Sequence, residues 1–180
     1  MSWMNSDGLY VKFGKEEADT AAGGHYNVDG ATKSVEVTIP YSEFASTTPA
    51  IVGSVGNPGA RGVILPKGAV IEKVTVVCTE AFTASAGTLG SASLVLGTKE
   101  AGDRSTEADH DGLTTSSATV TALGLATLGS ITELVQGSTG HGADIGGSPL
   151  AENQVLVASN ATHGTNTLDA GEVKVRIDFR

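Results

Sequence analysis

The fold class of this chain is decided by its closing stretch, Glu172-Val173-Lys174-Val175-Arg176-Ile177-Asp178-Phe179-Arg180. Apolar residues stand at every second position of this stretch, and charged residues occupy the positions between them. Because side chains of a β-strand point alternately to opposite faces, the pattern predicts a strand with one face in a core and one in water. The charged face would also protect the strand from unwanted pairing if it lay at the edge of a sheet.

The same alternation recurs in shorter segments toward the N-terminus. Pro40 ends one of these segments, or places it at a sheet edge, because proline cannot donate to a strand ladder. Residues 131–136 fit either a strand or a single helical turn, and residues 98–112 read as a charged loop. Further strands are predicted at 9–13, 34–39, 63–65, 91–97, 119–128 and 155–157, of which 119–128 has no clear period.

The longest β-patterned stretch covers residues 69–82. Val74, Val76 and Cys78 share one face of this predicted strand, and the alternation breaks where Glu72 and Lys73 stand side by side. A β-bulge at that polar pair would restore the pattern. On its apolar face, Cys78 is interpreted as a small buried hydrophobic residue and not as a reactive thiol.

Composition supports an all-β fold. The chain has 180 residues, 24 of them glycine, and only 4% aromatic residues. This length fits one domain, and many short strands with glycine-rich turns are typical of a β-sandwich. We therefore predict a single β-sandwich, jelly-roll-like, over residues 31–180, with residues 1–30 as an extended N-terminal arm.

Charge and cysteine content exclude several classes of protein. The net charge of -9 argues against nucleic-acid binding, which needs cations to neutralise phosphates. Cys78 is the only cysteine, so a fold stapled by internal disulfides is excluded. The first residues lack the pattern of a signal peptide, and no apolar run has the length of a membrane span. We expect a protein made in a cytoplasm, with no membrane partner and no cofactor.

The sharpest local motif is the acidic loop from Glu107 to Gly112. Its alternating acidic residues followed by glycine resemble the start of a calcium loop, but the twelfth position holds Ala118 in place of the required glutamate. A solvated acidic turn is therefore favoured over calcium binding. The histidines lack zinc-site spacing, and no serine lies in a nucleophile motif. We expect no metal site, no catalytic residues and no enzymatic activity.

The predicted arm holds a large share of the few aromatic residues. Trp3, Leu9, Tyr10 and Phe13 lie within the first thirteen positions. Aromatic side chains are enriched at interface hot spots because they bury a large area at low entropic cost. These four residues are the candidate interface with a capsid or with another copy, although they could equally pack on their own sandwich.

Four segments together resemble a group of small tailed-bacteriophage virion proteins: residues 2–18, 65–74, 103–113 and 173–180. The resemblance implies a capsid decoration, or cement, protein on the outer surface of the virion, in a β-sandwich or jelly-roll fold. It further implies the major capsid protein as partner, self-association that favours a homotrimer, and no catalytic residues. The faces that carry Val77 and Val95 should otherwise be polar, which gives weak independent support for self-association.

Two other functions remain open at this point. One is a receptor- or carbohydrate-binding module of a head or tail fibre, which would need exposed aromatic residues for stacking on sugars. The other is a small β-sandwich hydrolase or lyase, which the missing catalytic constellation disfavours.

Overall fold

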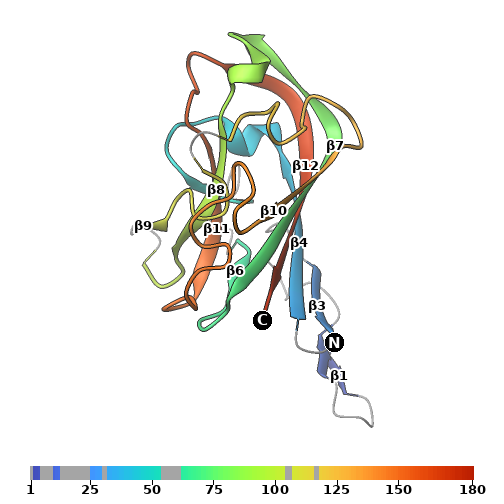
Figure 1. The fold of residues 1–180 in the computed structure, drawn as a ribbon, viewed down its shortest axis with the longest axis vertical. Coiled ribbons are helices and arrows are strands. Elements are labelled where there is room, and N and C mark those ends of the chain that lie inside the picture. Colours follow the sequence, from blue (N-terminus) through green and yellow to red (C-terminus); the bar gives the residue numbers. More distant parts are fainter. Residues whose placement is uncertain are drawn as a thin grey trace.

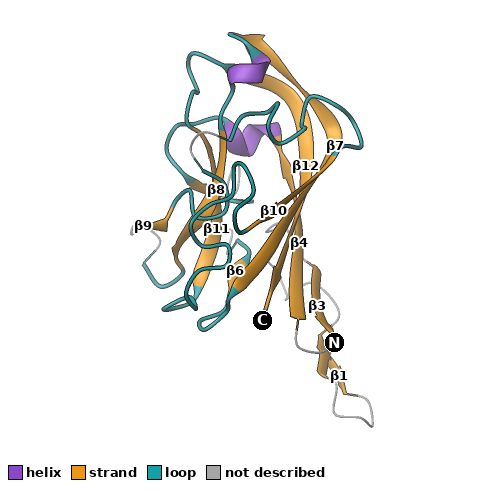
Figure 2. Cartoon of the chain, in the orientation of Figure 1, coloured by secondary structure: helices purple, strands orange, loops and turns teal. Residues whose placement is uncertain are grey.

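Two antiparallel β-sheets face each other and enclose one apolar core (Figure 1). The computed structural model describes residues 2–4, 10–12, 25–29, 32–53, 62–103, 107–115 and 118–180. Helix in these residues is confined to two short 3-10 segments, η1 (Tyr41–Phe44) and η2 (Leu89–Ser91), as Figure 2 shows. The prediction of an all-β sandwich is confirmed.

The first sheet has five strands, with the C-terminal strand at its centre. In spatial order they are β10 (Ile131–Val135), β7 (Ile71–Ala86), β12 (Thr167–Phe179), β4 (Thr32–Pro40) and β3 (His25–Asp29). The second sheet also has five strands. They are β5 (Ala50–Ile51), β11 (Gln154–Asn160), β8 (Leu94–Glu100) and β9 (Glu107–Asp109), with β6 (Ile64–Leu65) paired to β11.

The order of these strands is that of a jelly roll. We number β4, β5, β7, β8, β9, β10, β11 and β12 from one to eight along the chain. One sheet then reads 1-8-3-6 and the facing sheet 2-7-4-5. This alternation between sheets is the double Greek key that defines the jelly roll. The prediction of a jelly-roll-like sandwich is confirmed, and β3 adds a fifth strand beside β4.

The closing strand β12 lies as the alternation predicts, but in the middle of its sheet. Val173, Val175, Ile177 and Phe179 are all buried in the core. β12 pairs with β4 on one side and with β7 on the other. The edge position that we considered for this strand is therefore wrong, since the first and last strands of a jelly roll pair with each other inside the sheet.

Strand β7 contains the predicted bulge. Asp178 of β12 pairs with Lys73, whereas the next residue, Phe179, pairs with Ile71, so Glu72 is the extra residue. The bulge returns both Ile71 and Val74 to the buried face. The polar pair in the sequence therefore marked the bulge correctly.

The strand predicted at 119–128 is wrong. Apart from a bridge at Thr119, these residues form successive turns, in which Leu123 donates its N–H to Thr119 and Gly124 donates to Thr121. Gly124 has a φ of 70°, which an extended strand does not allow. The apolar residues of this segment, Val120, Leu123 and Leu125, are nevertheless buried. These side chains pack against the core from a loop. The segment is therefore rich in apolar residues but lacks the alternation of a strand.

One further prediction needs correction. The charged loop at 98–112 is partly strand, since β8 runs to Glu100 and β9 begins at Glu107. Of the two alternatives for residues 131–136, the strand is confirmed, over Ile131–Val135. Among the described residues, no helix has the length and apolar content needed to cross a membrane.

Candidate interaction surfaces and an acidic loop cluster

Part of the predicted arm forms a small separate hairpin. β1 (Ser2–Met4) pairs with β2 (Tyr10–Lys12), with Trp3 opposite Val11. Figure 1 shows this hairpin beyond the end of β3 and β4, away from the sandwich. Leu9 and Phe13 lie outside the described residues. The division of the chain at residue 30 stays a prediction, to which the structure adds that His25–Asp29 joins the first sheet.

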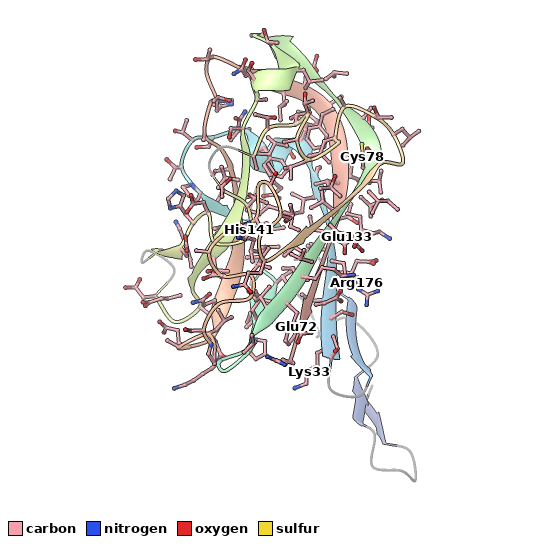
Figure 3. The ribbon with its side chains drawn as sticks, in the orientation of Figure 1. Lys33, Glu72, Cys78, Glu133, His141 and Arg176 are labelled. Atoms are coloured by element: carbon pink, nitrogen blue, oxygen red, sulfur yellow. The ribbon has the colours of Figure 1, made fainter. Side chains whose placement is uncertain are left out.

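The outer face of the first sheet carries a network of ion pairs. Lys73 reaches Glu133 at 3.1 Å and Asp178 at 3.8 Å, and Arg176 reaches Asp178 at 2.8 Å. Figure 3 places Glu133 and Arg176 along this part of the molecule. An exposed pair such as Lys73–Glu133 contributes about 0–1 kcal/mol. Asp178 is buried, and its two cationic partners offset the cost of burying its charge.

An apolar patch interrupts this charged face at its β10 edge. Ile131 is 66% exposed, and the preceding turn exposes Leu128 at 67%. Val135 is exposed on the same strand, and Val77 is half-buried opposite Ile131. Ion-paired Glu133 lies between Ile131 and Val135 on this face, so Val135 stands apart from the other apolar residues. Exposed large apolar residues that lie together are typical of an interaction surface. We name Val77, Leu128 and Ile131 the β10 patch.

The two valines that the sequence singled out have different surroundings. Val77 is half-buried and belongs to the β10 patch. Val95 is only 1% exposed in the single chain, so it needs no neighbouring copy to cover it and gives no support for self-association. Sequence reasoning missed Leu128 and Ile131, because residues 119–128 are predicted as a strand and the segment 131–136 has no clear face in the sequence.

The acidic motif at 107–112 gains a carboxylate from a distant segment. Ligand atoms of Asp109, His110 and Asp111 lie within 4.8 Å of one another. Asp144, which follows 32 positions after Gly112, packs against this turn: a side chain at Gly112 would collide with the Asp144 carboxylate. Nothing near Asp144 in the sequence pointed to this meeting, which the jelly-roll connections bring about.

The electrostatics of this cluster are unfavourable for three ionised carboxylates. Burial, with the charges of Asp109 and Asp111, raises the pKa of the Asp144 carboxyl to about 6. Burial and a hydrogen bond with Asp111 also raise the pKa of Asp109. One oxygen of Asp144, Oδ2, is buried without a hydrogen-bond partner. Ala118, at the position where a calcium loop needs glutamate, is buried in the core and offers no carboxylate to this turn.

Cys78 and His141, two side chains that could take part in catalysis, are both held in contacts with the backbone. Cys78 is buried, its thiol lies 3.4 Å from the carbonyl of Leu125, and burial raises its pKa, which disfavours the reactive thiolate. His141 packs its Nδ1 against the carbonyl of Ser138. Figure 3 places His141 and Cys78 in different parts of the molecule. These two groups therefore form no nucleophile–base pair.

Fold and surface together define a jelly-roll β-sandwich with an N-terminal hairpin, an apolar patch and an acidic turn. No model of a known protein family matches the chain, and no curated protein sequence matches it either. Among solved structures, the chain is similar to one in the capsid of Ralstonia phage GP4. The TM-score is 0.50 at 13% sequence identity, over 92% of this chain and 89% of that one. At this identity the similarity establishes the fold.

Proposed function

We propose that this chain is a structural, non-enzymatic protein of a phage virion. In this proposal it decorates the outer surface of the capsid and stabilises the shell by bridging subunits of the major capsid protein. The observation that carries the proposal is the likeness to a chain of a phage capsid over nearly the whole length of both proteins. It agrees with the virion-protein resemblance of four sequence segments.

The net charge supports an outer position over an inner one. A capsid interior is filled with DNA phosphates, and a protein with a net charge of -9 would be repelled there. The ion-paired outer face of the first sheet suits contact with water. The outside of the shell carries no comparable electrostatic cost for this chain.

Two surfaces are available for binding. The β1–β2 hairpin is a two-stranded sheet, and an isolated two-stranded hairpin is at best marginally stable in water. Docking on a capsid subunit would supply the missing contacts. The β10 patch provides apolar area for a second contact, and we assign it to self-association as a homotrimer.

Deleting residues 1–14 is expected to abolish most of the capsid binding and the protection of the shell against heat. A ligand that binds only the assembled shell stabilises it by mass action, and the deletion removes the hairpin that would bind. The measurement adds purified protein to capsids that lack it, followed by sedimentation and thermal release of DNA. Circular dichroism of the free protein should be unchanged in shape, which controls for folding.

Equal binding and protection by the truncated chain would reject the role of the arm. Failure of the full chain to bind would reject the decoration function itself.

Replacing Leu128 and Ile131 together by lysine is expected to convert the oligomer to an 18 kDa monomer in light scattering. The two lysines would bring unpaired charges into an apolar contact, where losing their hydration is costly. The affinity of the copies for one another should therefore fall several-fold or more. Folding stability should change by less than about 1 kcal/mol, because both side chains are exposed. The matched control is Ile64→Lys, an exposed isoleucine of the second sheet. A variant that associates like the control would remove the patch from the interface.

A further inference from the structure

Two loops from distant parts of the chain meet at the acidic cluster through their backbones. The N–H of Asp144 donates to the carbonyl of Gly112 at 2.9 Å, and the N–H of Gly142 donates to the carbonyl of Leu113 at 3.1 Å. The N–H of Thr115 donates to the carbonyl of Gly140 at 3.1 Å. Three cross-loop hydrogen bonds therefore hold the turn 110–115 against the loop 140–147.

Glycine makes this close approach possible. A Cβ at Gly142 would overlap the backbone of Gly112, and a Cβ at Gly112 would overlap the carboxylate of Asp144. The two loops therefore touch backbone to backbone, and the Asp144 carboxylate is confined against the turn. Confinement leaves its Oδ2 buried and without a hydrogen-bond partner.

The charges that act on this carboxylate are negative. Asp109 and Asp111 face it from β9 and the following turn, and both disfavour its ionised form. His110 can carry a positive charge, and its charge acts on Asp109. β8 meets the turn with Gly97, which has no side chain. A proton on the cluster removes one of three mutually repelling charges, and a neutral carboxyl is less costly to bury than a carboxylate.

We propose that Asp109, Asp111 and Asp144 form a proton-dependent latch between the turn 110–115 and the loop 140–147. The latch is closed when the cluster holds a proton and loosens when all three carboxylates are ionised. It is a property of the single chain and does not depend on the proposed capsid function. Capsid binding could fail while the latch holds, and the reverse is equally possible.

The direction of the pH effect follows from proton linkage. The Asp144 carboxyl has an ordinary pKa of 3.8 and a pKa of about 6 in the closed fold. The closed form therefore binds the proton more tightly, and its advantage is lost as the pH rises through about 6. Between pH 5 and pH 7.5, the equilibrium constant for opening should rise by up to about tenfold, since one pKa unit corresponds to a factor of ten.

Hydrogen exchange measured by NMR on the full chain tests the latch, at pH 5 and pH 7.5 in buffer with EDTA, after correction for intrinsic exchange. From pH 5 to pH 7.5, the protection factors of the amides of residues 115, 142 and 144 should fall by up to about tenfold more than the protection factor of the Val52 amide. Val52 donates to Leu156 away from the cluster and serves as an internal control. Equal changes at Val52 and at the latch would overturn the proposal.

Three variants assign the effect to its residues. Asp144→Asn should abolish the pH dependence, and Asp111→Asn should move its midpoint to lower pH by removing one repelling charge. Asp169→Asn, which alters an exposed acid elsewhere, should leave the wild-type change intact. His110→Gln tests whether the neighbouring imidazole, and not the carboxylates, causes the change. The latch is refuted if His110→Gln removes the pH dependence or if Asp144→Asn keeps it. If Asp144→Asn does not fold, an unshifted midpoint in Asp111→Asn refutes it as well.

Discussion

Replacing Phe82 by alanine is expected to lower the free energy of unfolding by about 3–5 kcal/mol, the cost typical of deleting a buried phenylalanine. Phe82 is 1% exposed, and its ring meets Phe44 edge-on, with centroids 6.1 Å apart and an interplanar angle of 67°. Only 4% of the residues are aromatic, so most neighbouring side chains are small or aliphatic. Such side chains are too small to fill the space that the ring leaves. Loss of the edge-on contact with Phe44 adds to the cost of the cavity that the alanine leaves.

Thermal and denaturant unfolding check this expectation. For a chain of this length the loss corresponds to roughly 10 °C in melting temperature. Ser85→Ala, an exposed position on the same strand, is the control and should change stability by less than about 0.5 kcal/mol. A Phe82→Ala variant as stable as the control would show that the end of the sandwich repacks around the missing ring.

Replacing Gly97 by alanine should have an effect of comparable size through a different cause. A Cβ at this position of β8 would overlap backbone atoms of Asp109 and His110. Backbone cannot rotate away as a side chain can, so the β8–β9 connection must move, at a cost of about 3 kcal/mol or more. The expected result is a lower melting temperature and faster proteolysis within residues 100–115.

The matched control for this variant is Gly102→Ala. A Cβ at Gly102 meets nothing within 4 Å, and this exposed glycine lies in the same connection. Its stability should stay within about 0.5 kcal/mol of the wild type. Equal stability of the two alanine variants would mean that the β9 turn is not packed on β8 as described.

The fold class and the buried faces of the best-patterned strands follow from the amino-acid pattern alone. Val173 to Phe179, Val35 to Ile39 and Val74 to Cys78 are buried as their period-2 alternation predicts. Even the bulge at Glu72 was predictable, because a bulge shifts the alternation by one residue and leaves a visible break. These features are local, and each is encoded in neighbouring residues.

Predictions failed where burial comes from other parts of the chain. The segment 119–128 is apolar because it plugs the core as turns, and a single sequence does not distinguish such a loop from a poorly patterned strand. Val95 looked like an interface residue because its position in the alternation should face solvent. The folded chain covers it instead, so both faces of β8 are buried over much of its length.

The strand order, the central position of β12 and the residues of the two candidate surfaces depend on contacts between distant parts of the chain. β12 pairs with β4, although more than a hundred residues separate them in the sequence. Asp144, from the loop 140–147, interacts with Asp109 and Asp111 of β9 and the turn that follows it. Such long-range pairs are chosen by how the two sheets close around a shared core, not by any local preference. The alternation of residues fixes which face of a strand is buried, whereas its neighbours in the sheet are set by the packing of the whole chain.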